Sequence, residues 1–184
     1  MKTQAEKLIE RLNLKPLTVE GGYYRETYRS TECIEKDGLP DRYTGPRSYS
    51  TAIYYLLTPE TCSTLHRLPS DEVFHFYQGD PVEMLQLNED GTGTVLSLGC
   101  DIENGLLPQV VVPKDTWQGA RLMDGGSYAL FGTTVAPGFE FEDHVVGERA
   151  ALIAAYPAFK SMIERLTTDT MTEQSVDTLK TKPF

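Results

Sequence analysis

The chain has 184 residues, 40% of them hydrophobic and 24% charged, and this length predicts one domain with at most a terminal appendage. Its 17 basic and 27 acidic residues give a formal net charge of -10, which disfavours a broad phosphate-binding surface and hence a nucleic-acid partner. No apolar run reaches the ~18–20 residues of a membrane span, and residues 1–14 lack the apolar core of a signal peptide. Cys33, Cys62 and Cys100 are odd in number and far apart, which predicts no disulfide framework and favours the cytoplasm.

The predicted elements change character twice along the chain. Residues 3–13 carry a narrow apolar stripe at helical spacing, and Pro16 ends this short helix. From Thr18 to Asp143, short runs of β-branched and aromatic residues alternate with turn residues, which predicts an all-β sandwich or barrel. The predicted strands are 23–28, 51–57, 61–65, 72–78, 83–87, 93–97, 109–113, 117–122, 128–135 and 139–142.

The remaining segments complete the predicted organisation. Residues 31–46 are polar and turn-rich, which indicates a loop inside the domain. A helix is predicted over residues 156–166, followed by a polar tail, 167–184, expected to be frayed or disordered. The predicted division is an N-terminal helix packed on the barrel (1–17), the barrel itself (18–157), and a C-terminal helix with its tail (158–184).

Two of the three histidines, His66 and His75, lie in one short segment. In a strand of period two over residues 72–78, Glu72 shares a face with Phe74 and Phe76, while His75 points the other way. An unpaired carboxylate among aromatic rings is strongly disfavoured in a closed core, so Glu72 is expected to face a cavity. The alternative is that Glu72 begins an exposed strand and pairs with an arginine.

The spacing of this segment resembles the first motif of the cupin superfamily, HxHxxxExxxxxxG. His66, Glu72 and Gly79 match the motif, and Leu68 stands in place of its second histidine. The second cupin motif is similar to residues 105–118.

In this second segment Pro113 matches, Asp115 stands where glycine is usual, and Gln118 stands where the histidine ligand would be. Longer strings throughout residues 5–157 resemble one branch of the superfamily, the RmlC-like cupin-5 family, a domain of unknown function. The strings are 21–29, 52–56, 71–81, 112–118 and 135–142. The resemblance implies a double-stranded β-helix jelly roll, usually a homodimer, with a small-molecule pocket inside the barrel. It supplies no established reaction.

The resemblance also bears on metals. In metal cupins, two histidines and the glutamate of the first motif and a histidine of the second surround Fe, Mn, Ni or Zn. Two of the four positions are altered here, so a divalent metal, if present, would be left with His66, Glu72 and Gln118. This donor set is weaker than that of the usual catalytic metal site.

Without a metal, His66 and Glu72 are candidate catalytic groups for proton transfer. Histidine titrates near neutral pH, and desolvation beside Phe74 and Phe76, which are taken to line the pocket, raises the pKa of a carboxyl group. Gln118 would supply a hydrogen bond. Metal-free sugar epimerases of the superfamily use a histidine base with a tyrosine acid, and by analogy the candidates for that acid are Tyr24, Tyr28, Tyr54 and Tyr55, of which Tyr28 and Tyr54 are taken to bind substrate.

Arginine is suited to anion recognition, and in the stretch 21–30 Arg25 and Arg29 are expected on one strand face. One of them would anchor an anionic substrate, or else form an internal ion pair with Glu26, Glu72 or Glu140.

Several further side chains have expected places. His75 is expected to be packed or hydrogen-bonded on the face opposite Glu72, and Trp117 to pack. His144 is expected to be exposed at a turn, just after an edge strand, 139–142, that closes one mouth of the barrel.

Three functions remain open at this point. The first is an isomerase or epimerase acting by His66/Glu72 proton transfer on a polar, sugar-like or anionic compound. The second is a non-catalytic module that binds a metabolite. The third is a metal-dependent enzyme, which needs an ion that the ligand count barely supports.

Overall fold

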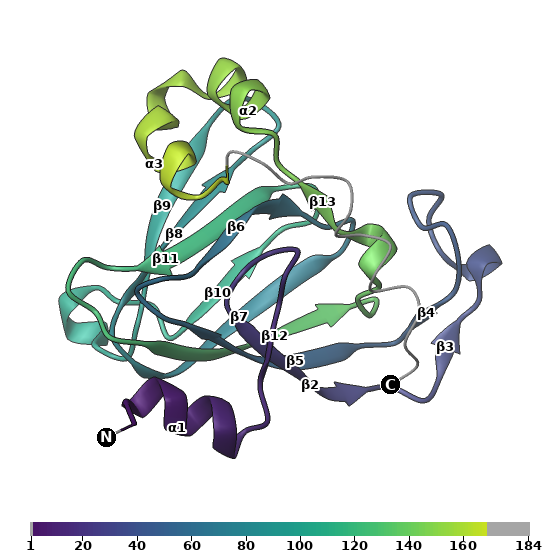
Figure 1. The fold of residues 1–184 in the computed structure, drawn as a ribbon. Coiled ribbons are helices and arrows are strands. Elements are labelled where there is room, and N and C mark those ends of the chain that lie inside the picture. The colour runs from purple at the N-terminus through teal and green to yellow at the C-terminus, as the bar shows by residue number, and fades with distance from the viewer. Residues whose placement is uncertain (1, 169–184) are drawn as a thin grey trace.

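Two antiparallel β-sheets pack face to face in the computed structural model, which describes residues 2–168 (Figure 1). The six-stranded sheet has the order β1-β2-β5-β12-β7-β10, the five-stranded sheet the order β13-β6-β11-β8-β9, and β3 and β4 form a small third sheet. This is the predicted all-β jelly roll. The strands are β1 (Lys15–Pro16), β2 (Tyr23–Arg29), β3 (Cys33–Ile34), β4 (Arg47–Ser48), β5 (Thr51–Leu57), β6 (Cys62–Arg67), β7 (Asp71–Gly79), β8 (Val82–Leu87), β9 (Gly93–Leu98), β10 (Gln109–Val112), β11 (Trp117–Leu122), β12 (Ala129–Ala136) and β13 (Val145–Val146).

Helices cover the outside of both sheets. Helix α1 (Gln4–Arg11) begins with a capping box, in which Thr3 Oγ1 accepts from the Glu6 amide and the Thr3 amide donates to the Glu6 carboxylate. Its apolar stripe packs against Leu56 and Leu130 of the six-stranded sheet. Helices α2 (Arg149–Ala155) and α3 (Lys160–Arg165) pack on Leu65, Leu85 and Leu87 of the five-stranded sheet. Within the described residues, no helix is long and apolar enough to cross a membrane.

The C-terminal helical region differs from the prediction of one helix over residues 156–166. Helix α2 ends at Ala155 because Pro157 disfavours helical geometry at the residue before it, and Tyr156 has φ -129° and ψ 61°. A short 3-10 helix, η4 (Pro157–Phe159), then leads into α3. The predicted tail falls, from residue 169 on, outside the described residues, and the proposed division at residues 17 and 157 stays a prediction.

The main core fills the space between the two sheets. Phe74, Phe76, Phe131, Tyr55 and Met84 belong to it, all with at most 7% of their surface exposed. At one end of this core, the register places Arg29, Thr51, Val135 and Glu72 in one row across β2, β5, β12 and β7. A cavity lies at this end.

The predicted edge strand 139–142 is wrong. The amide groups of Gly138 and Phe139 donate to the Ser48 carbonyl and to Thr51 Oγ1 rather than to a neighbouring strand, and the chain then turns into the 3-10 helix η3 (Phe141–Asp143). Two further 3-10 helices, η1 (Lys36–Gly38) and η2 (Ile102–Asn104), lie in connecting loops.

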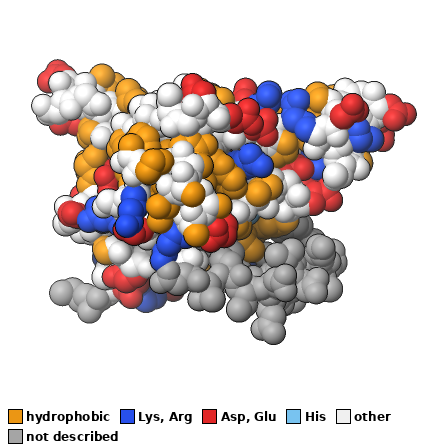
Figure 2. All heavy atoms as spheres, turned by 90° about the horizontal axis from the view of Figure 1, so that it is seen from above, with side chains coloured by type: hydrophobic (Ala, Val, Ile, Leu, Met, Phe, Trp, Pro, Cys, Tyr) orange, Lys and Arg blue, Asp and Glu red, His pale blue; other side chains and the backbone are white. Residues whose placement is uncertain are grey.

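The surface carries charges of both signs. On the face shown in Figure 2, acidic and basic side chains are interspersed with hydrophobic ones, and no broad basic field is visible there.

Candidate functional site

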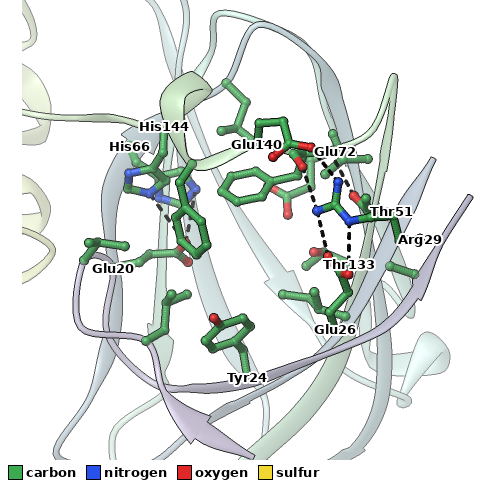
Figure 3. A pocket seen from close by; sticks show the side chains of 18 residues that line it. Glu20, Tyr24, Glu26, Arg29, Thr51, His66, Glu72, Thr133, Glu140 and His144 are labelled. Atoms are coloured by element: carbon green, nitrogen blue, oxygen red, sulfur yellow. Dashed lines mark hydrogen bonds and ion pairs between the residues drawn. The ribbon is translucent and has the colours of Figure 1, made fainter. Parts of the chain in front are cut away.

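The cavity at the end of the barrel combines apolar walls with titratable side chains (Figure 3). Its volume is about 70 Å³, and since one water needs roughly 10–15 Å³ by this kind of measure, it accommodates several waters or a compact organic molecule. The segment over residues 139–141 lines it, although as an irregular turn. The polar lining residues are Glu20, Tyr24, Glu26, Arg29, Thr51, His66, Glu72, Thr133, Glu140 and His144.

The predicted residues His66, Glu72 and Gln118 come together in a buried chain of hydrogen bonds. Gln118 Nε2 donates to Glu72 Oε2 at 2.6 Å and lies 3.0 Å from His66 Nε2. His66 Nδ1 lies 2.7 Å from the Thr64 carbonyl oxygen. Because a carbonyl only accepts, Nδ1 carries the proton, and in the neutral ring Nε2 accepts from Gln118.

Glu72 lies on the cavity wall, on the same face of β7 as Phe74 and Phe76 and opposite His75. Burial raises the pKa of its carboxyl group to about 7, although the His66 ring and the hydrogen bonds from Thr133 and Gln118 oppose this rise. The expectation that Glu72 faces a cavity is therefore supported over the alternative of an exposed arginine pair.

A second cluster on the cavity wall joins His66 to two residues that sequence reasoning missed or misplaced. Glu20 Oε2 lies 3.8 Å from His66 Nε2 and 3.6 Å from His144 Nε2. The two imidazole rings stack with their centroids 4.6 Å apart. Burial disfavours the charge on Glu20, but the neighbouring histidines and a hydrogen bond from Ser63 outweigh burial and lower its pKa to about 2.

A glycine turn positions Glu20 in the loop before β2. Gly21 has φ +108°, and a Cβ atom there would lie 2.1 Å from the Cys62 carbonyl oxygen, so only glycine fits. The Thr64 amide donates to the Glu20 carbonyl at 2.9 Å, and Ser63 Oγ donates to Glu20 Oε1 at 2.5 Å. The paired glycines at 21 and 22 were the sequence signal that could have pointed to Glu20.

His144 was predicted to be exposed, and this prediction is wrong, because only 5% of its side chain is exposed. The residue follows η3, which a buried ion pair fixes in place: Arg47 Nε and Nη2 donate to the two Asp143 oxygens at 2.7 and 2.6 Å. After η3, Val145 and Val146 pair with β6 opposite Arg67 and His66. These contacts direct the His144 ring onto that of His66.

Arg29 lines the cavity but has no free donor. Its five N–H groups donate to Glu26 twice, to Glu140, to Ser48 and to the Phe139 carbonyl, which is the full complement of a guanidinium group. The internal ion pair, one of the two alternatives considered for this residue, is thus present.

Arg25 does not share the face of Arg29, contrary to the prediction. A β-bulge between Glu26 and Tyr28 shifts the register of β2 against β5, and such a bulge reverses the alternation of side chains beyond it. Arg25 lies instead over the Tyr54 ring, 5.4 Å from its centroid, and neither residue lines the cavity.

Most of the other predicted residues lie away from the cavity. Tyr28 is 55% exposed, and Phe74 and Phe76 lie in the apolar core beneath the cavity. Of the four candidate tyrosines, Tyr24 lines the cavity, whereas Tyr55 is buried and its hydroxyl donates to the Gly21 carbonyl at 2.8 Å.

His75 and Trp117 have the surroundings expected of them. His75 Nδ1 lies 3.1 Å from Gln109 Nε2. Trp117 packs against the second core cluster, with the Arg67 guanidinium 4.7 Å from its ring centroid.

The ligand positions of the cupin motifs do not fit a metal ion in this chain. Leu68 offers no donor atom, and the Gln118 amide nitrogen, whose hydrogens face His66 and Glu72, lies between the two remaining ligands. A metal ion requires lone pairs rather than N–H groups there.

Comparison with known proteins relates the chain to one protein family. The family model described as Cupin superfamily (DUF985) matches residues 6–147. An uncharacterized Saccharomyces cerevisiae protein, YML079W, is 32% identical over 133 residues, and the match covers 68% of this chain and 66% of the yeast protein, just under two thirds of its length.

Two solved structures are similar over nearly the whole chain. A hypothetical protein from Leishmania major is 32% identical with a TM-score of 0.79, covering 91% of this chain and all of that one. Protein SO0799 from Shewanella oneidensis is 31% identical with a TM-score of 0.80, covering 92% of this chain and all of that one. The chain belongs to the DUF985 family of the cupin superfamily, as the motifs predicted.

Proposed function

We propose that this cupin is an enzyme of the isomerase or epimerase class, which moves a proton on a compact, neutral, polar molecule held in the cavity. The observation that carries the proposal is the position of Glu72. Its buried carboxyl group lies on the cavity wall and accepts a hydrogen bond from the neutral Gln118 amide. No arginine or lysine pairs with it among the described residues, so nothing holds it permanently ionised.

The electrostatics of the cavity support this role. A carboxyl group with a pKa of about 7 both takes and gives a proton near neutral pH, as an acid–base catalyst must. Glu20 in the same cavity has a pKa of about 2 and stays ionised. Two carboxyl groups of one site with pKa values pushed apart are typical of a division of labour between them.

The neighbours of Glu72 take supporting roles in the proposal. His66, the other predicted proton-transfer group, accepts the Gln118 amide through Nε2 and so orients Gln118 toward Glu72. To act as a base itself, His66 must first release that amide. Tyr24 is the tyrosine that lines the cavity, and burial raises its pKa, so its phenol stays protonated and can donate a hydrogen bond to the substrate.

The charge of the cavity favours a neutral substrate over an anionic one. Arg29 was the predicted anion anchor, but all five of its donors are engaged. Arg29 offsets only one of the two charges of Glu26 and Glu140, and Glu20 adds another carboxylate, so acidic groups outnumber Arg29 on the walls. A small hydroxyaldehyde or hydroxyketone carries no charge and is small enough for the volume of this cavity.

The binding-module alternative draws support from the apolar part of the lining, which includes Leu17, Val19, Ile53, Leu68 and Val135. Such walls can hold a metabolite without any reaction taking place.

The free thiols of Cys33, Cys62 and Cys100 favour a reducing compartment, the cytoplasm, as the place where the protein acts.

Incorporation of deuterium from the solvent distinguishes an enzyme that transfers a proton from a module that only binds its ligand. The full chain is incubated in D₂O with glyceraldehyde, dihydroxyacetone, erythrose and xylose, and proton NMR follows loss of the C–H signal next to the carbonyl. We expect exchange in at least one compound, slowed by about 10²-fold or more in Glu72→Gln, in line with the loss of an acid–base group. The matched control, His75→Gln, changes a histidine outside the cavity and should exchange like the wild type. Exchange in none of the four, or equal rates in Glu72→Gln, would overturn proton transfer in favour of binding.

A further inference from the structure

Glu20, His66 and His144 bring one carboxylate oxygen and two imidazole nitrogens to a single point on the cavity wall. The three ligand atoms all lie within 4.8 Å of one another. Figure 3 shows these three side chains grouped on one side of the cavity, across from the Arg29 ion pairs. We propose that they bind one first-row divalent metal ion of the Zn²⁺ type, at a site that shares only His66 with the ligand positions of the cupin motifs.

The distances suit such an ion. Zn–N and Zn–O bonds of about 2.0–2.2 Å at tetrahedral angles place neighbouring ligand atoms roughly 3.4 Å apart. The separations from Glu20 Oε2 are 3.8 Å to His66 Nε2 and 3.6 Å to His144 Nε2, so these two pairs need to close by a few tenths of an ångström. The ligand atoms of the two histidines lie within 4.8 Å of each other and must also move together as the ion binds. Two histidines and one carboxylate are the donor set of one type of catalytic zinc site.

The surrounding hydrogen bonds are those that metal ligands have. His66 donates Nδ1–H to the Thr64 carbonyl, which leaves the Nε2 lone pair directed away from the backbone. Ser63 holds the second oxygen of Glu20, so Oε2 is left for an ion. His144 Nε2 is buried and has no hydrogen-bond partner among the described residues, although a carboxylate lies nearby.

Gln118 must release His66 for the ion to bind. The His66 Nε2 lone pair now accepts from the Gln118 amide, and an ion would take its place, while Gln118 keeps its bond to Glu72. Glu72 is therefore outside the coordination sphere. Metal binding at this site does not require proton transfer at Glu72, but it removes the hydrogen bond by which His66 orients Gln118.

Three protein ligands leave one tetrahedral position for water or for a substrate oxygen, and the residues around it line the cavity. When bound there, the ion supplies Lewis-acid polarisation of such an oxygen. The two histidines and Glu20 hold it at the wall.

The test is a calorimetric titration of untagged, chelator-stripped full chain with Zn²⁺. We expect one equivalent per chain, with affinity lowered more than about 100-fold in Glu20→Gln and in His144→Gln, which exceeds the 10–100-fold typical of outer-shell changes. His75→Gln, the matched control, and Glu72→Gln should bind within a few-fold of the wild type. Circular dichroism and urea unfolding check that each variant is folded.

A second measurement needs no variant. Zinc should shift the NMR signals of the His66 and His144 rings and leave those of His75 in place. The proposal is overturned by the absence of saturable binding, by affinity that survives both Glu20→Gln and His144→Gln, or by affinity that Glu72→Gln removes instead.

Discussion

The buried ion pair of Arg47 and Asp143 is predicted to hold the turn that carries His144. Arg47 is 2% exposed and Asp143 8% exposed, two short hydrogen bonds join them, and the Arg47 guanidinium also lies 5.4 Å from the Tyr43 ring centroid. Removing one partner of such a pair leaves an uncompensated buried charge, which costs about 3–5 kcal/mol. For a domain with a typical stability of roughly 5–15 kcal/mol, this is a large fraction.

Urea unfolding of Arg47→Met measures this loss directly. Because replacing both partners of a buried pair by apolar residues is often close to neutral, Arg47→Met with Asp143→Leu should recover a large part of the stability lost in the single variant. The reasoning is refuted if Arg47→Met costs less than about 1 kcal/mol, the value of an exposed pair, or if the double variant loses the sum of the two single losses.

Further predictions concern Glu72, Gly21 and assembly. Because the folded state raises the pKa of Glu72 from 4.5 to about 7, Glu72 binds its proton more tightly when folded, so its contribution to stability is full below pH 4.5 and is lost as the pH rises through 7. Between pH 5 and 8 the wild type should lose roughly 2–3 kcal/mol relative to Glu72→Gln in urea unfolding at each pH, and parallel profiles would contradict the raised pKa. Gly21→Ala should cost about 1–3 kcal/mol in the same assay, because φ at this position is positive and Cys62 blocks a Cβ; an unchanged unfolding midpoint would show that the turn relaxes freely. The homodimer implied by the family resemblance should give twice the mass of one chain in light scattering at micromolar concentration, and a monomer would refute it.

The alternation of β7 was readable from the sequence because it is a local, periodic property. The two-residue period of a strand predicted that Glu72 shares one face of β7 with Phe74 and Phe76, and that His75 lies on the opposite face. The structure has this arrangement. The same rule failed in β2. A single bulged residue between Glu26 and Tyr28 moves Arg29 to the cavity and leaves Arg25 outside, and no periodic signal announces such a shift.

Glu20 and His144 could not be found by spacing, because 124 positions separate them in sequence. Long-range contacts with β6 bring them together, through the Thr64 amide for Glu20 and through the pairing of β13 for His144. The expected edge strand 139–142 failed for a related reason. Its alternating Phe and Glu residues have strand spacing, but the backbone amides at 138 and 139 bond to β4 and to a threonine side chain instead.

The most direct test of the central claim is an NMR titration of the Glu72 side-chain carboxyl carbon in protein labelled with ¹³C-glutamate and kept free of metal. The signal is assigned by its absence in Glu72→Gln. The account predicts a titration midpoint near pH 7, the value to which burial raises this carboxyl group. A midpoint between about 4 and 5, the ordinary range of glutamate, would show that Glu72 is fully ionised at neutral pH and would contradict its role as the proton-transfer group.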